Sequence, residues 1–179
     1  MKIEQLGTKI VYENPWMRVR EDQVSRGDGS TGIFGVVEKP DFALIIPVDN
    51  DGDFWLVEQY RYPVGGRYWE FPQGSWETSA NADPASLAKG ELREETGITA
   101  GSMLHLGHLY EAYGYCDQGF DVWLATDLRV GVPERSTEEQ DMTTRRVSRV
   151  EWTEMIADGR VKDAPSIAAF TLLLMHERG

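Results

Sequence analysis

A chain of 179 residues, 41% hydrophobic and 27% charged, has enough apolar material for one domain with its own core. The 30 acidic residues outnumber the 18 basic ones to give a net charge of −12, which argues against a nucleic-acid-binding surface, because such surfaces need clustered Lys and Arg. Cys116 is the only cysteine, so no intrachain disulfide can form, and no apolar run is long enough to cross a bilayer. We therefore expect a soluble, cytoplasmic protein without a nucleic-acid or membrane partner.

Segments rich in β-branched and aromatic residues alternate with turn signals in the N-terminal part of the chain, which predicts strands. Asn50-Asp-Gly-Asp53 separates two apolar runs and indicates a hairpin. The expected strands are Ile10–Tyr12, Trp16–Val24, Ile33–Glu38, Phe42–Val48 and Phe54–Tyr60.

The first helix is expected between Asp83 and Gly97. Asp83 is a suitable N-cap, and Pro84 stands at the first helical position, where a missing N–H costs nothing. Ala88 and Leu92 belong to an apolar stripe, and Gly97 is placed to end the helix.

The remaining chain predicts further strands and two more helices. We expect Thr153 to cap a short helix that ends at Gly159. Strands followed by helices late in the chain favour one compact α+β unit over a doubly wound parallel sheet. The expected strands are Met103–Glu111, Phe120–Leu128 and Arg145–Trp152, and the final helix is Pro165–His176.

Three glutamates share one face of the first helix, because Glu91, Glu94 and Glu95 are spaced i, i+3 and i+4. Like charges at this spacing repel each other, so a divalent cation would stabilise them, and carboxylate oxygens favour Mg²⁺ or Mn²⁺. The alternative is a solvated acidic face, with Lys89 and Arg93 as scattered counter-charges.

The segment from Gly74 to Ile98 resembles the Nudix box, and Gly90-Glu-Leu-Arg-Glu-Glu-Thr-Gly-Ile98 matches the second half of that motif except at its arginine. Two departures stand out. Gly74 lies two residues farther upstream than the pattern has it, and Ala82 and Gly90 replace a Glu and an Arg that pair with each other in the family. Losing both partners together leaves no orphan charge, so the acidic site is expected to remain intact.

Two segments outside the box, Val57–Pro63 and Trp69–Gly74, look like ADP-ribose and nucleotide-sugar pyrophosphatases of that family. The resemblance implies a Nudix-type α/β/α sandwich with a mixed β-sheet and an N-terminal β extension. It divides the chain into an extension at residues 1–40, used for dimerisation, and a Nudix hydrolase domain at residues 41–179. We therefore expect a homodimer.

The same resemblance assigns substrate and metal contacts residue by residue. Arg61 and Glu70 are expected to contact substrate or line its pocket, and Trp69 is expected either to stack on substrate or to pack in the core. The backbone carbonyl of Gln73 is expected to bind metal together with Glu91, Glu94 and Glu95, and Glu77 is expected to support that site.

The catalytic loop of this branch maps onto Glu138-Glu-Gln-Asp-Met142. Glu138 is expected to take a proton from the attacking water, with Glu139 as the fallback. Glu94 would bind the metal directly or through water. Gln140 replaces an acidic metal contact found in some relatives, which implies one charged ligand fewer.

These assignments predict Mg²⁺-dependent hydrolysis of ADP-ribose or a related nucleoside diphosphate sugar, with Mn²⁺ as a possible substitute. The products would be a nucleoside monophosphate and a sugar phosphate. The segment Tyr113–Phe120 does not map onto the ADP-ribose enzymes, so a Nudix hydrolase of GDP-sugars, dinucleoside polyphosphates or oxidised nucleotides stays open as an alternative. Two alternatives of other classes are a non-catalytic module that senses a nucleotide and a structural or interaction protein with an accidental motif.

Overall fold

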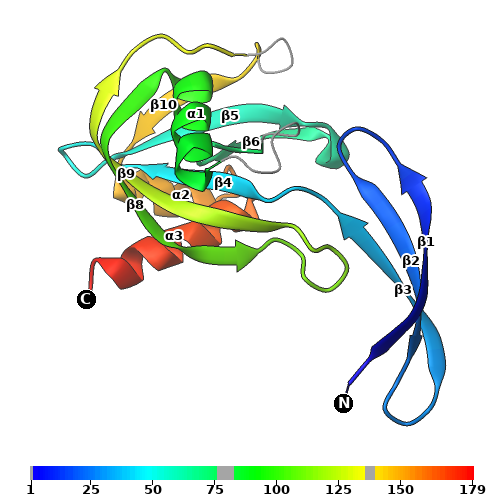
Figure 1. Ribbon diagram of the computed structural model, residues 1–179. Coiled ribbons are helices and arrows are strands. Elements are labelled where there is room, and N and C mark those ends of the chain that lie inside the picture. Colours follow the sequence, from blue (N-terminus) through cyan, green and yellow to red (C-terminus); the bar gives the residue numbers. More distant parts are fainter. Residues whose placement is uncertain (1, 76–82, 136–139) are drawn as a thin grey trace.

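The computed structural model describes residues 2–75, 83–135 and 140–179. In these described ranges, three β-sheets and three α-helices make up an α+β fold (Figure 1). The expected fold class is confirmed, including the mixed sheet and the N-terminal β extension.

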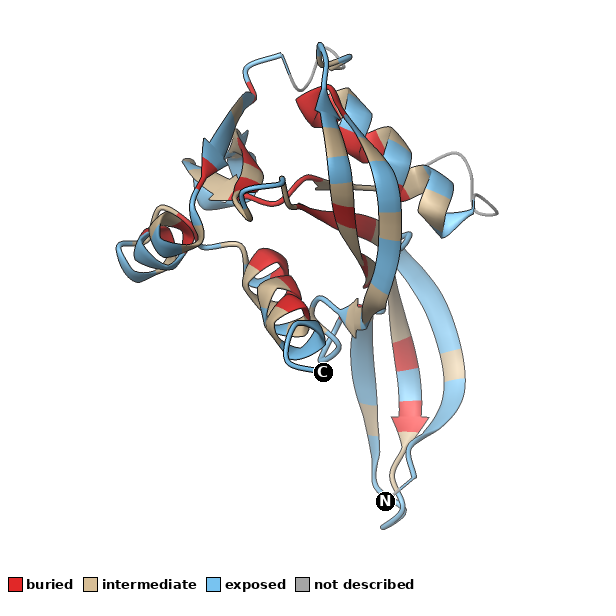
Figure 2. Cartoon of the chain, turned by 90° about the vertical axis from the view of Figure 1, so that its left-hand side faces the viewer, coloured by how far each residue is buried: buried red, intermediate tan, exposed pale blue. Residues whose placement is uncertain are grey.

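The N-terminal extension is an antiparallel sheet that projects away from the rest of the molecule (Figure 1). Most of its residues are exposed (Figure 2). It joins the body where Val37 and Cys116 form a β-bridge and the Val37 N–H donates to the Tyr115 carbonyl at 2.8 Å. Its strands are β1 (Glu4–Glu13), β2 (Arg18–Ser25) and β3 (Thr31–Glu38).

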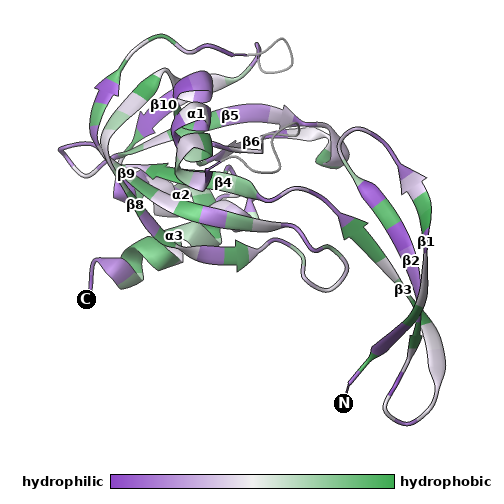
Figure 3. Ribbon diagram, viewed as in Figure 1, coloured by the Kyte–Doolittle hydropathy of each residue, from purple (hydrophilic) through white to green (hydrophobic). Residues whose placement is uncertain are grey.

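The mixed sheet has the strand order β7-β4-β9-β8, and its two central strands, β4 and β9, run parallel to each other. Residues 43–47 of β4 are all buried, as expected for a strand covered on both faces. Helices lie on the two faces, so this strand is apolar throughout (Figure 3). The strands are β4 (Phe42–Pro47), β7 (Gln73–Gly74), β8 (Ile98–Tyr110) and β9 (Gly119–Val130).

Helix α1 (Pro84–Thr96) packs on one face of the mixed sheet through Ala88 and Leu92. The predicted boundaries are confirmed. Asp83 accepts a hydrogen bond from the Ser86 N–H at 3.1 Å, and Gly97 ends the helix in the left-handed conformation at φ 74°.

An antiparallel sheet, in the order β10-β5-β6, also contacts α1 through β5. Its strand β6 was not expected from the sequence. The short 3-10 turn η1 (Tyr62–Val64) and the left-handed Gly65 return the chain alongside β5. The strands are β5 (Phe54–Arg61), β6 (Gly66–Glu70) and β10 (Thr143–Val147).

The predicted strand Arg145–Trp152 is wrong beyond Val147. The side chain of Ser148 accepts from the Glu151 N–H at 3.1 Å and starts helix α2 (Arg149–Ala157), so Thr153 is not the cap. Trp152 is a helical core residue that packs beside Phe71 and Phe54.

The last helix, α3 (Ala164–His176), covers the other face of the mixed sheet through Ala169 and Leu173. Its N-cap is Asp163, which accepts from the Ser166 N–H at 2.9 Å. None of the helices in residues 2–75, 83–135 and 140–179 has the length and apolar character needed to cross a lipid bilayer.

Asp83→Ala should lower the free energy of unfolding by about 1 kcal/mol, because the helix loses its N-terminal side-chain acceptor. Asp83→Asn keeps an acceptor and is the matched control. Urea unfolding of the three proteins tests this expectation, and equal midpoints for Asp83→Ala and wild type would contradict it.

Candidate active site

The carboxylate of Glu91 lies against the backbone of β7. A Cβ built on Gly74 would be 2.5 Å from Glu91 Oε2 and 2.8 Å from Glu91 Oε1. Any side chain at position 74 would therefore displace this carboxylate. Glu91 itself is buried, with 6% of its surface exposed. The glycine is required for the close approach of strand and helix, not for a turn.

Glu95 faces the same strand, one helical turn after Glu91. Its Oε2 accepts from the Gln73 N–H at 3.1 Å, and the residue is 2% exposed. The carbonyl of Glu95 accepts from Arg135 Nε at 2.9 Å, and Arg135 also donates to Thr144 Oγ1 at 2.6 Å. Arg135 therefore links the end of α1 to the start of β10. Of the three glutamates on this helix face, Glu91 and Glu95 are buried and Glu94 is partly exposed.

Glu91, Glu95 and the backbone of Gln73 together present oxygen donors of the kind that a hard divalent cation takes. Burial of two carboxylates side by side is costly unless a cation or hydrogen-bond donors compensate. Within the described ranges, no three His, Cys, Asp or Glu side chains form a metal-holding group, so a full ligand set would need backbone oxygen, water or substrate. With that supplement, the residues fit a divalent ion.

Arg61 and Glu70 form an ion pair across β5 and β6. Arg61 Nε donates to Glu70 Oε2 at 3.1 Å, and Gln59 Nε2 donates to Glu70 Oε1 at 2.7 Å. Burial raises the pKa of Glu70, which is 1% exposed, while Arg61 opposes that shift. The negative charge of Glu70 raises the pKa of Arg61 against the effect of burial, so the guanidinium stays charged and oriented.

A cavity of about 680 Å³ brings these groups together. Arg61, Glu70, Gln73 and Gly74 all line it, so the structure joins the two sequence segments singled out beside the acidic helix. The lining also includes residues that the sequence did not assign to the site. They come from the β3–β4 connection, from β6, from the loop before β9 and from the residues just before α3: Lys39, Tyr68, Tyr115, Gln118, Lys162 and Asp163.

Asp163 has two functions at this cavity. It caps α3, and its Oδ2 accepts from Gln73 Nε2 at 3.2 Å, which fixes the segment that precedes Gly74. A second link comes from Ser166, whose buried hydroxyl accepts from the Phe71 N–H at 2.9 Å. The Asp163-Ala-Pro165 pattern, similar to Asp83-Pro84, was the available signal for this cap.

Comparisons with known proteins decide the family. A model described as the NUDIX domain matches residues 39–170, and a model described as the nucleoside diphosphate sugar hydrolase N-terminal domain matches residues 3–37. The chain belongs to the Nudix family.

Relatives of this Nudix chain cover nearly all of it. It is 34% identical to an ADP-ribose pyrophosphatase of Mycobacterium tuberculosis, over 97% of this chain and 83% of that protein. It is 26% identical to an ADP-ribose pyrophosphatase of Bacillus subtilis, over 87% of this chain and 84% of that protein. A crystal structure of an ADP compounds hydrolase superimposes with a TM-score of 0.86 at 18% identity, covering 100% of this chain and 96% of that one, which shows the same fold.

Of the expected site residues that the structure describes, Trp69, Glu91, Glu94 and Glu95 are not among those that line the cavity. Trp69 packs against the main core. Glu77, Glu138 and Glu139 lie outside the described residues, as does Ala82.

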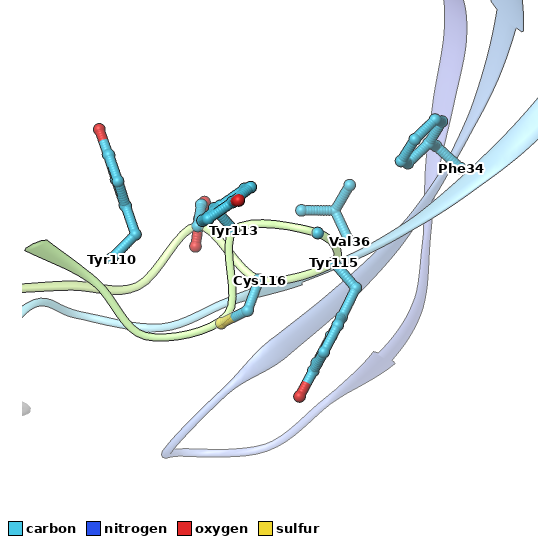
Figure 4. Close-up of a pocket in the computed structure, with 8 residues that line it drawn as sticks. Phe34, Val36, Tyr110, Tyr113, Tyr115 and Cys116 are labelled. Carbon is cyan, nitrogen blue, oxygen red and sulfur yellow. The ribbon is translucent and has the colours of Figure 1, made fainter. Parts of the chain in front are cut away.

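A second, smaller cavity of about 220 Å³ lies between β3 and the loop that precedes β9. Aromatic side chains from both elements surround it (Figure 4). Tyr115 lines this cavity as well as the large one, so the loop separates the two. The aromatic members are Phe34, Tyr110, Tyr113 and Tyr115.

Gly74→Ala should leave the fold intact but weaken divalent-cation binding by about tenfold or more, because the new methyl group displaces the Glu91 carboxylate. Gly35→Ala is the matched control, since nothing lies within 4 Å of a Cβ at that strand position. Titration with Mn²⁺ followed by paramagnetic resonance measures the affinity. Equal affinity in Gly74→Ala and wild type would contradict the expectation.

Proposed function

We propose that this Nudix protein hydrolyses the diphosphate bond of ADP-ribose or a related nucleoside diphosphate sugar, using Mg²⁺ or Mn²⁺. The products are a nucleoside monophosphate and a sugar phosphate. The observation that carries the proposal is the placement of Glu91 and Glu95 against the Gln73–Gly74 segment, which itself lines a cavity together with Arg61. The named activity of the two pyrophosphatase relatives supports the substrate class.

The divalent ion would be held by Glu91, Glu95 and the carbonyl of Gln73, with Glu94 as a ligand directly or through water. When bound, it neutralises diphosphate charge and acidifies a water molecule. The close contact between Gly74 and Glu91 fixes one carboxylate, and the Gln73 N–H fixes the other. Preorganised oxygen ligands need no rearrangement when substrate arrives.

Arg61 is the substrate-binding cation in this proposal. Its side chain is 40% exposed and lines the cavity, so its guanidinium can reach a phosphate oxygen. Glu70 holds it in one orientation through the ion pair, and Gln59 holds Glu70. A charge-assisted hydrogen bond from an oriented guanidinium is stronger than a neutral one.

Glu138 acts as the general base in this proposal, with Glu139 as the fallback, and Glu77 supports the metal. Arg135 and Asp141 flank the segment that contains Glu138 and Glu139. Arg67 Nη1 donates to Asp141 Oδ2 at 2.5 Å, while Arg135 contacts the carbonyl of Met142. These contacts tie Asp141 to β6 and Arg135 to the residue that precedes β10.

We also propose a cytoplasmic location, because the single cysteine, Cys116, is buried and reduced. A small nucleotide-linked substrate is the expected partner.

Glu95→Gln should reduce kcat for ADP-ribose by about a hundredfold or more at saturating Mg²⁺, because a charged metal ligand is lost. Glu154→Gln, at an exposed position on α2, is the control and should match wild type. Product formation is followed by chromatography of AMP and ribose 5-phosphate. Wild-type turnover by Glu95→Gln would refute the assigned metal site.

The N-terminal sheet is proposed to form a homodimer interface. Its three strands project from the body and expose large apolar side chains, whereas Val24 is its only buried hydrophobic residue among those described (Figures 2 and 3). An exposed apolar surface of this kind is typical of a protein interface. A second copy is the occupant proposed for it. The exposed side chains include Ile3, Leu6, Ile10, Val11, Tyr12, Trp16, Ile33 and Phe34.

Ile33→Glu should shift the protein from dimer to monomer, because a charge is placed in the apolar contact. Val150→Glu changes an equally exposed apolar residue on α2 and should leave the dimer intact. Sedimentation equilibrium gives the mass. A wild-type mass that is monomeric at every concentration would contradict the proposed dimer.

A further inference from the structure

The turn between α2 and α3 places Lys162 at the cavity. Gly159 adopts φ 82° after α2, and the Arg160 carbonyl accepts from the Trp69 N–H at 3.0 Å. The Val161 N–H donates to the Met155 carbonyl at 2.9 Å, and the Val161 side chain is buried. The turn is therefore attached to both β6 and α2, which sets the backbone of Lys162 beside β6.

Two contacts position the Lys162 side chain. Its Nζ lies 5.1 Å from the centroid of the Tyr68 ring, and its Cε lies 3.1 Å from the position of a Cβ built on Gly159. Tyr68 is the residue that precedes Trp69 on β6, and both Tyr68 and Lys162 line the cavity. The ammonium is thus held over an aromatic face at the edge of the site.

Lys162 has no ion pair with any residue that the structure describes. The neighbouring Asp163 carboxylate already accepts from Ser166 and Gln73. A cation–π contact leaves the three ammonium N–H donors available to an anion. Arg61, by contrast, is paired with Glu70, whereas Lys162 has no carboxylate within ion-pair distance among the described residues, although Glu111 and Asp163 also line the cavity.

We propose that Lys162 donates a hydrogen bond to a phosphate oxygen of the bound diphosphate and is a substrate-binding residue of this enzyme. The proposal rests on the proposed function for the identity of the substrate. Tyr68 and Gly159 place the ammonium before substrate arrives, so binding immobilises less of a flexible side chain. Lys39 also lines the cavity and has no ion pair among the described residues, but no ring or turn positions its ammonium.

The proposed hydrogen bond from Lys162 to the phosphate exists when substrate is bound and persists in the transition state. Loss of such uniform binding raises KM and leaves kcat nearly unchanged. Lys162→Met keeps the apolar stem beside Tyr68 and removes the charge, so KM for ADP-ribose should rise about tenfold or more. Lys162→Arg keeps a cation and should recover most of the affinity. Lys89→Met removes an exposed charge on α1 and serves as the control.

Binding of inorganic pyrophosphate to the full chain, measured by calorimetry in the presence of chelator, tests the role of Lys162 separately from the proposed hydrolase activity. Lys162→Met should bind pyrophosphate about tenfold more weakly than wild type or Lys89→Met. If Lys162→Met showed this loss and the wild-type protein did not turn over ADP-ribose, the results would support phosphate binding by Lys162 and refute the proposed hydrolase activity. Wild-type pyrophosphate affinity and KM in Lys162→Met would overturn the Lys162 proposal. A lower melting temperature with unchanged KM would likewise overturn it, because it would show a structural role only.

Discussion

The carboxylate of Glu91 can lie against β7 because residue 74 has no side chain, and much of the site depends on this contact. Ala88 and Leu92 bury the apolar side of α1 and thereby fix the rotation of the helix about its axis. With that rotation, Glu91 and Glu95 face the strand, where the Gln73 N–H holds the second carboxylate. Ala88, Glu91, Leu92 and Glu95 share one buried face of the helix, so packing of the apolar pair also determines where the two carboxylates lie.

The wall opposite α1 depends on a different set of contacts. Asp163 and Ser166, at the start of α3, hold Gln73 and Phe71 in place. The turn that carries Lys162 is hydrogen-bonded to Trp69 in the same segment. The chain between β6 and β7 is therefore fixed by α1 on one side and by α3 on the other, which connects the proposed metal-binding and substrate-binding residues.

The sequence was sufficient to predict α1, because cap, proline, apolar stripe and terminal glycine all agree there. It was misleading at Arg145–Trp152, where β-branched and aromatic residues favour a strand but the Ser148 cap starts a helix around a core tryptophan. Arg61 and Glu70 were selected by resemblance alone. Their ion pair follows from the β5–β6 register, which local propensity does not specify.

Residues brought to the cavity by long-range contacts could not be predicted from local patterns. Lys162 follows a turn with no motif of its own, and its position depends on hydrogen bonds to β6. Tyr115 and Gln118 belong to the segment that the family resemblance did not explain, and the structure assigns that segment to the cavity wall. The same segment joins the N-terminal sheet to the body through Val37, so it connects the proposed dimer interface with the site.

The central claim is that the buried glutamates and the cavity perform divalent-dependent diphosphate hydrolysis. The most direct test is turnover by the wild-type protein of a panel containing ADP-ribose, GDP-mannose, UDP-glucose and a diadenosine polyphosphate, with Mg²⁺ and with chelator. We expect ADP-ribose or one nucleotide sugar to be cleaved to a nucleoside monophosphate and a sugar phosphate, and we expect chelator to abolish the reaction. Binding of these compounds without any turnover in Mg²⁺ would contradict the account and indicate a nucleotide sensor.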